Sequence, residues 1–273
     1  MSMFYRALVY FLVAWPAAAQ SQAFEKITIT PAHSTGPGSS RMQMLPNGDL
    51  IATAVPVIEL LSYAYDVPVN PSPRVAPLPD WTIVERYDIE AKAPVNAIAP
   101  GLQDIELRSR VQQMIRGLLA DSFRLAMRVQ NQRMLFFALT VSSSGPKFQK
   151  SAITEKECIF DTAPGGCHSF NIGFGHPLNA IAINMDDIAY YISNWTDLPV
   201  VNRTELSGLF AVSTAGWLPA RLPLPPPNAA GNVDFSALPS IFTVLGKLGL
   251  ELHQQEGVLP VYTVEHIERP PAN

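Results

Sequence analysis

The chain has 273 residues, of which 48% are hydrophobic and 15% are charged, and its formal net charge is −4. This composition is typical of a chain that buries an apolar core, and the length allows one large domain or two small ones. A mildly acidic chain without a run of Lys and Arg is a poor candidate for a nucleic-acid-binding protein, so we expect no nucleic-acid partner.

The N-terminus has the pattern of a secretory signal peptide. Arg6 supplies a positive charge, residues 7–15 form an apolar core too short to span a bilayer, and the alanines at 17–19 resemble a cleavage site. We therefore predict a signal peptide at 1–19 and a mature protein that is periplasmic or secreted, without a transmembrane anchor after cleavage. An uncleaved membrane anchor is the alternative.

The first half of the mature chain alternates strand and helix patterns. The helices are predicted because apolar residues recur at i, i+3, i+4 and i+7, as at Val57, Leu60, Leu61 and Ala64. The expected elements, in chain order, are a strand at 24–30, a hairpin of 42–45 and 50–54 about Asn47-Gly48, a helix at 57–65, a strand at 87–93, a helix at 111–119, and two strands at 123–129 and 135–141.

The second half repeats this order at an offset of roughly 125 residues. We expect a helix at 185–192 with Asn184 as its N-cap, a strand at 210–213, a helix at 241–248, and two final strands at 250–254 and 258–266. The prediction is an α+β fold of two related β-α-β-β-α-β-β units, although chance resemblance is an alternative. Their expected bounds are 20–147 for the first unit, 148–177 for a Gly-rich linker, and 178–273 for the second unit, with a Pro-rich insertion at 218–234.

Several longer motifs also carry a family resemblance. They are LLSYAY at 60–65, PDW at 79–81, RYDIEAKA at 86–93, LLADSFRL at 118–125, PVVNRTELSG at 199–208 and LGLEL at 248–252. With these motifs the chain resembles the exported acidobacterial proteins of unknown function known as TIGR03435 or DUF3738. Its units look similar to the short N-terminal (STN-like) domains of secretins and TonB receptors, which are periplasmic docking modules. The resemblance implies no catalytic motif, and Ser122 and the segment 210–212 depart from the usual pattern.

Cys158 and Cys167 are the only cysteines, and they lie in the predicted linker. In an exported chain they favour a disulfide, which would close a loop of ten residues and contribute about 2.7 kcal/mol in the chain-entropy model. The alternative is a metal site with His168 and His176, but the paired short spacings of structural zinc sites are missing. We therefore predict a disulfide, with no metal and no cofactor.

Three further groups could carry chemistry. Asp186 and Asp187 resemble a pair of catalytic carboxylates, but acidic residues in the first turn of a helix more commonly complement its dipole. Arg86 and Asp88 share one face of a strand, which favours a solvated cross-strand pair. The segment 142–145 lacks the G-x-S-x-G pattern of a nucleophile elbow. No catalytic residue is predicted.

These observations lead to three hypotheses for the function. The first is a non-catalytic binding or docking protein of the bacterial cell envelope, which recognises an envelope protein through an edge strand or through the Pro-rich segment 218–228. The second is a periplasmic ligand-sensing module that binds a cell-wall-derived ligand between its units. The third is an exported hydrolase, whose first candidate residues are Asp161, His168 and His176.

Overall fold

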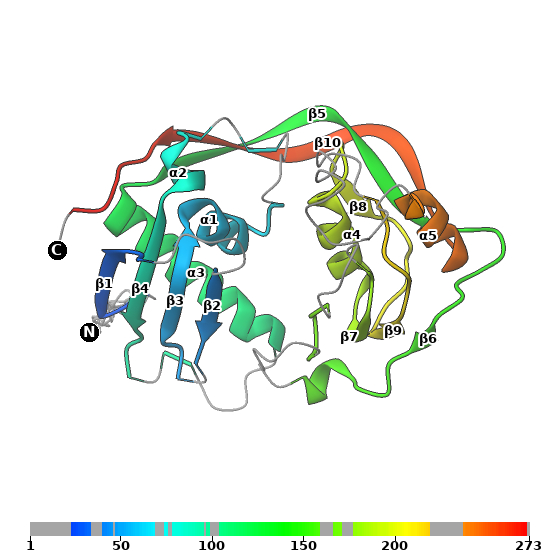
Figure 1. The fold of residues 1–273 in the computed structure, drawn as a ribbon, viewed down its shortest axis with the longest axis horizontal. Helices are drawn as coiled ribbons and strands as arrows, with labels where there is room; N and C mark the ends of the chain where they lie inside the picture. The colour runs from blue at the N-terminus through cyan, green and yellow to red at the C-terminus, as the bar shows by residue number, and fades with distance from the viewer. Residues whose placement is uncertain are drawn as a thin grey trace, which may run out of the picture.

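The computed structural model contains both helices and sheets, as the α+β prediction requires. It describes residues 23–33, 40–45, 47–68, 74–75, 78–95, 97–98, 104–158, 166–170, 177–218 and 237–271. The predicted signal peptide lies outside these residues, and so does nearly all of the predicted Pro-rich insertion. The described elements form two lobes that are bridged by a long two-stranded ribbon (Figure 1).

The first lobe is built on an antiparallel four-stranded sheet with the order β1-β4-β3-β2. Its strands are β1 (Lys26–Pro31), β2 (Arg41–Met44), β3 (Leu50–Pro56) and β4 (Arg86–Lys92). The predicted hairpin joins β2 to β3, and Gly48 in its turn has a φ of 91°, which favours glycine. Arg86 and Asp88 do share a face, but both bind the backbone of Ala54, where β3 bulges.

Three helices complete the first lobe: α1 (Val57–Tyr65), α2 (Trp81–Val84) and α3 (Asp104–Phe123). The predicted stripe of α1 is buried against α3 and the sheet, and Leu60 and Leu61 are at most 1% exposed. Burying a leucine side chain contributes about 1.5–3 kcal/mol, so these two helices supply much of the stability of the lobe. Gln112 and Arg116 of α3 also bind the last carbonyls of α1.

The second lobe has its own apolar core, which includes the fully buried Trp217. Its elements are β6 (Gln149–Lys150), a short 3-10 helix η1 (Glu155–Glu157), β7 (Ala180–Ile183), α4 (Met185–Ser193), β8 (Val200–Asn202), β9 (Phe210–Val212) and α5 (Ile241–Lys247). The strands β6, β9 and β7 form a small sheet. The order β7-α4-β9-α5 resembles β3-α1-β4-α3 in the first lobe. This similarity of order does not by itself establish an internal repeat, which stays a prediction.

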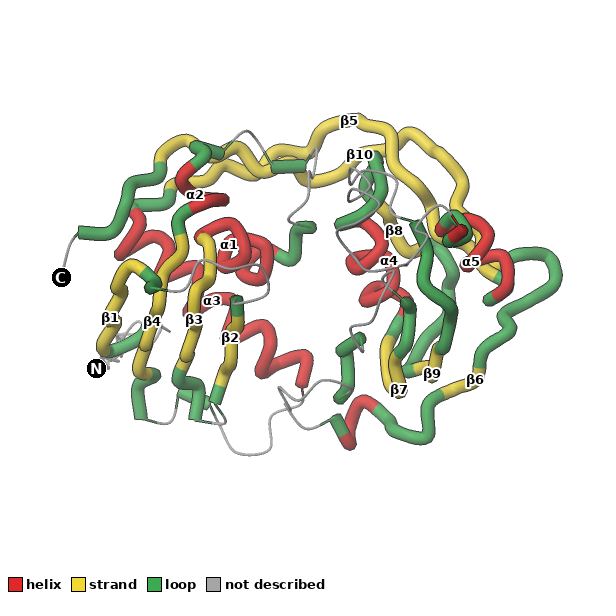
Figure 2. The backbone as a smooth tube through the Cα atoms, in the orientation of Figure 1, coloured by secondary structure: helices red, strands yellow, loops and turns green. Residues whose placement is uncertain are grey.

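The bridge between the lobes consists of β5 (Ala126–Val141) and β10 (Leu250–His266), which pair antiparallel along their whole length (Figure 2). The sequence predicted two separate strands in each of these segments, and that prediction is wrong, because each segment is one continuous strand. The polar stretch 130–133 is continuous strand, and its side chains are exposed on both faces of β5. Exposure on both faces removes the apolar alternation by which a strand is usually identified.

Each end of the ribbon packs on a different lobe. Met127 and Val264 contact the core of the first lobe, whereas Leu139 and Leu250 belong to the core of the second. The segment after β10 therefore returns to the first lobe, where Arg269 binds Glu85. As a result, β5 directly follows the first lobe in sequence, but its C-terminal end contributes to the core of the second lobe.

Candidate functional site

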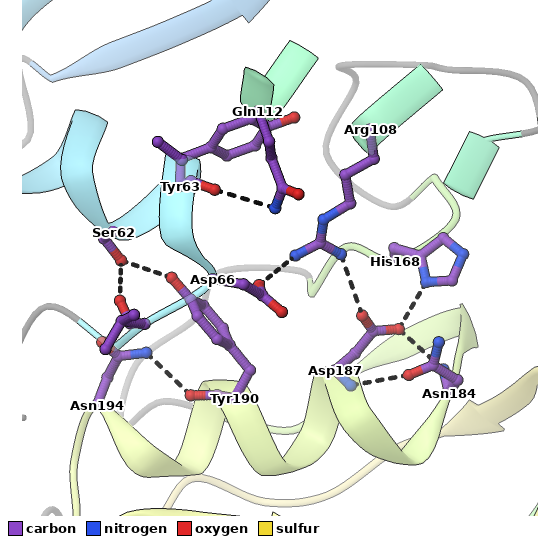
Figure 3. Close-up of polar contacts among 12 residues, drawn as sticks. Ser62, Tyr63, Asp66, Arg108, Gln112, His168, Asn184, Asp187, Tyr190 and Asn194 are labelled. Atoms are coloured by element: carbon purple, nitrogen blue, oxygen red, sulfur yellow. Dashed lines mark hydrogen bonds and ion pairs between the residues drawn. The ribbon is translucent and has the colours of Figure 1, made fainter. Parts of the chain in front are cut away.

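Polar side chains from both lobes meet where α1 and α3 face α4 (Figure 3). We call them the inter-lobe cluster, which consists of Ser62, Asp66, Arg108, His168, Asp187 and Tyr190. The sequence singled out only Asp187 and His168 of this set. Because the other members come from helices far apart in the chain, no spacing in the sequence reveals them.

Asp187 is the best-anchored member of the cluster. The predicted N-cap Asn184 accepts a 2.8 Å hydrogen bond from the Asp187 backbone, and the Asp187 carboxylate accepts one of 2.9 Å from the Asn184 backbone. This reciprocal capping box fixes the start of α4. It agrees with the helix-start interpretation of Asp186-Asp187, and the Asp187 side chain is only 8% exposed.

The His168 ring lies between two carboxylates. Its Nδ1 is 2.7 Å from Oδ2 of Asp187, and its Nε2 is 3.1 Å from Oε2 of Glu155. Hydrogen bonding to Asp187, together with the nearby charges, outweighs burial and raises the pKa of His168 to about 9. Because both ring nitrogens donate to carboxylates, His168 is a cation at neutral pH. A protonated imidazole is a poor general base, which weakens His168 as a candidate residue of the hydrolase hypothesis.

Arg108 extends from α3 of the first lobe to α4 of the second. Its guanidinium donates a 2.8 Å hydrogen bond to Asp66 at the end of α1 and lies 3.8 Å from Asp187. Burial disfavours its charge, but Asp66 and Asp187 raise the pKa of Arg108 despite this penalty. Arg108 is therefore a fixed cation that links one carboxylate of each lobe.

Ser62 and Tyr190 form a second link between the lobes. Their hydroxyl oxygens are 2.6 Å apart, and they lie 128 residues apart in sequence. Ser62 Oγ also donates a 2.5 Å bond to the carbonyl of Val67. A serine has a single hydroxyl proton, so Tyr190 must be the donor to Ser62. The lobes are thus held together here by hydrogen bonds and ion pairs.

The predicted disulfide is present and lies next to this cluster. Cys158 and Cys167 are joined, with their Cα atoms 5.7 Å apart. Cys158 is buried, and Cys167 precedes the clamped His168 directly in the chain. The other proposed metal ligand, His176, and the hydrolase candidate Asp161 lie outside the described residues.

A second candidate site is the outer edge of β10, which follows β5 as the last strand of its sheet. The bond from Ser142 N to Gly249 O fixes the phase of the ladder, so alternate residues from Leu250 to Val258 direct their N–H groups away from β5. The outward-facing Tyr262 N–H agrees with this phase, because it donates to Arg74 O. Between Leu250 and Pro260, no described residue pairs with this edge.

Comparison with known proteins identifies the family of the chain. Neither the curated proteins nor the solved structures contain a match to it. Within the described residues, every helix is too short or too polar to cross a membrane. A family model described as a protein of unknown function (DUF3738) matches residues 58–267, which run from α1 through the end of β10. The chain therefore belongs to the DUF3738 family.

Proposed function

We propose that this chain is an exported, non-catalytic docking protein of the bacterial cell envelope, and that it binds an extended segment of another envelope protein at the outer edge of β10. The observation that carries this proposal is the long edge of β10 without a partner strand among the described residues. The signal-peptide pattern supplies the location, and the STN-like resemblance supplies a precedent for docking. We also propose that the chain is a member of the TIGR03435 group.

The edge of β10 lacks the usual protection against strand addition. Proteins normally interrupt a long exposed edge with Lys, Pro, a bulge or a covering segment. From Leu250 to Val258 this strand has no lysine, no proline and no bulge, and the four side chains at 253–256 are all exposed. A first interruption comes only at Pro260, which has no N–H group. An extended peptide could therefore add to about nine residues of backbone.

Charge narrows the class of partner segment. The stretch Leu250–Val258 carries Glu251 and Glu256 but neither Lys nor Arg. Cross-strand neighbours of opposite charge stabilise a sheet, whereas like charges opposite each other destabilise it. Glu256 already pairs with Arg133 of β5, so the segment that fits this edge carries Lys or Arg opposite Glu251. The exposed Val258 offers an apolar contact.

Proline substitution separates binding at this edge from a loss of folding. Gln254 and Glu256 direct their N–H groups outward, so proline at both positions removes two donors to a partner without removing a bond to β5. The native Pro260 occupies an equivalent outward position. The matched control is valine at the same two positions, which keeps both N–H groups.

The experiment is a pull-down of the mature protein from the envelope fraction of its host, with quantitative mass spectrometry. We expect specific envelope proteins with wild type and with the valine variant, and their loss with the proline variant. Recovery of the same proteins with the proline variant would exclude this edge as the docking surface. If no variant recovers an envelope protein, the docking function itself is wrong.

A ligand-sensing role is the second candidate, and the inter-lobe cluster favours it. Arg108 and Tyr190 present a cationic group and a phenol between the lobes, where a soluble ligand can bridge α3 and α4. Soluble cell-wall fragments should then raise the melting temperature saturably, since a ligand at about 100 times its Kd stabilises the native state by roughly 2.7 kcal/mol. The shift should vanish in Arg108→Gln, and its absence in wild type would exclude this role.

A further inference from the structure

Three chemically distinct donor groups converge beside the inter-lobe cluster. A carboxylate oxygen of Glu155, Sγ of Cys158 and a ring nitrogen of His168 all lie within 4.8 Å of one another. Cys167 Sγ is bonded to Cys158 Sγ and is therefore adjacent to this group. Thiolate, imidazole and carboxylate are the three side-chain ligand types that zinc uses in proteins.

His168 is oriented as zinc-binding histidines usually are. Such a histidine donates its second ring N–H to a carboxylate, which fixes the direction of the ring. Here Asp187 binds Nδ1 at 2.7 Å, and Nε2 points toward Glu155. The capping box of α4 holds Asp187 in place. The backbone of His168 has a φ of 54°, a strained conformation that is maintained only where the surrounding structure requires it.

We propose that Cys158, Cys167, His168 and Glu155 form a zinc site when the Cys158–Cys167 bond is reduced, so that the disulfide and the metal site are alternative states of the same side chains. A tetrahedral zinc ion with bonds of about 2.0–2.3 Å separates its ligand atoms by about 3.3–3.8 Å. The ligand atoms of Glu155, Cys158 and His168, with separations of up to 4.8 Å, need only small side-chain shifts to reach this geometry. Cys167 Sγ, next to Cys158 Sγ, moves away from it when the bond between them is broken. This inference is independent of the docking proposal.

The conversion between the two states balances with a dithiol as the reductant. The dithiol gives two electrons and two protons to the disulfide and becomes a disulfide itself, which leaves Cys158 and Cys167 as thiols. Zinc then binds both thiolates and releases their two protons, and it also replaces the proton on Nε2 of His168. Cys167 is partly exposed and the Glu155 side chain is 44% exposed, so both reagents can reach the group.

The test measures zinc affinity of the mature protein by competition with a chromophoric chelator. A phosphine reductant is used, because thiol reagents would themselves bind zinc. We expect the oxidised protein to bind no zinc and the reduced protein to bind one ion per chain. The variant Cys158→Ser/Cys167→Ser should fail to bind. If reduced wild type binds no more zinc than this variant, the proposal is wrong.

Single substitutions distinguish the four-ligand site from binding by two thiols alone. His168→Gln and Glu155→Gln should each weaken zinc binding at least about 10-fold, and Asp187→Asn should weaken it about 10–100-fold through the orientation of His168. The matched control is His253→Gln, because His253 pairs with Glu251 at 2.9 Å but lies apart from the cysteines. Equal affinity of wild type and His168→Gln would overturn the proposal.

Cobalt provides a readout that does not depend on affinity. The reduced protein loaded with Co²⁺ should show thiolate-to-cobalt charge-transfer bands and the intense visible bands of tetrahedral coordination. His168→Gln should change the visible bands, and the double serine variant should lose the charge-transfer bands. Circular dichroism of each variant establishes that it is folded. A six-coordinate spectrum in folded, reduced wild type would contradict the four-ligand site.

Discussion

The interior of the first lobe and the contact between the lobes are built by different chemistry. Inside the lobe, α1 and α3 bury leucines, valines and isoleucines against the sheet. Between the lobes, the inter-lobe cluster joins α1 and α3 to α4 through hydroxyl, guanidinium and carboxylate groups. Exposing apolar side chains to water costs much free energy. Polar groups that separate can form hydrogen bonds with water instead of with each other, at a small net cost. The lobes should therefore be rigid, and the contact between them should open more readily.

Removing volume from the interior should have the largest effect. Leu119 of α3 is fully buried, and Leu119→Ala should lower the free energy of unfolding by about 2–5 kcal/mol, because it leaves a cavity. Chemical denaturation measures this change. Val84→Ala is the control at a 69% exposed site and should stay within about 0.5 kcal/mol of wild type. Equal effects at both sites would contradict the assigned core.

The stability of the ribbon between the lobes should be sensitive to substitution of one glycine, Gly257. A Cβ atom on Gly257 would lie 2.8 Å from the ring of the buried Phe136 on the paired strand. Gly257→Ala should therefore destabilise the protein by about 1–3 kcal/mol through overpacking. In the background of Phe136→Leu the same alanine should cost less, and a double-mutant cycle measures this coupling. Additive effects would show that the two residues do not touch.

Breaking the inter-lobe cluster should have a smaller effect on stability. Ser62→Ala/Arg108→Gln should cost about 1–2 kcal/mol, since it removes both hydrogen bonds of Ser62 and the partly exposed ion pairs of Arg108. The distribution of distances between spin labels at Val84 and Ile181, one on each lobe, should broaden in electron paramagnetic resonance. Lys92→Gln breaks an ion pair within the first lobe and is the control, which should leave the distribution unchanged.

The smallest effect should be the pH dependence that the ion pair between Lys92 and Asp49 gives to the free energy of unfolding. The hydrogen bond from Lys92, helped by the backbone of Ala93, holds the pKa of Asp49 below its ordinary value of 3.8. A lowered pKa in the folded state adds stability above the unfolded pKa, and this stability is lost as the pH falls through the folded value. The advantage of wild type over Asp49→Asn in urea unfolding should therefore shrink on acidification below pH 3.8. A constant difference would exclude this linkage.

The features that the sequence could predict depend on local interactions, and those that it could not predict depend on distant ones. The stripe of α1, the Asn47-Gly48 hairpin and the cap at Asn184 depend on residues within a few positions of each other, and all three are present. Their signals are backbone conformation and helical period, which a short window of sequence contains. The disulfide could also be predicted from the sequence, since two cysteines allow one intramolecular pairing.

The ribbon and the inter-lobe cluster were not accessible in this way. Pairing of β5 with β10 depends on chain segments more than a hundred residues apart, and the exposed stretch 130–133 of β5 carries no apolar alternation. Likewise, Ser62 meets Tyr190 across 128 positions, and neither residue type carries a distinctive spacing. Such contacts follow from how the helices are placed in three dimensions, which a single sequence does not specify locally.

The pairing of β5 with β10 also dictates when the protein can finish folding. Residues 126–141 pair along their whole length only with residues 250–266, so the ribbon cannot form before almost the whole chain has left the ribosome or crossed a membrane. Contacts between segments so distant in sequence form slowly, because a long loop must close first. During that interval β5 has no β10 partner strand, and a chain that is cut short before Leu250 would keep this aggregation-prone edge permanently. Late closure of this kind fits the proposed export, because a chain that crosses a membrane unfolded can complete the ribbon only afterwards.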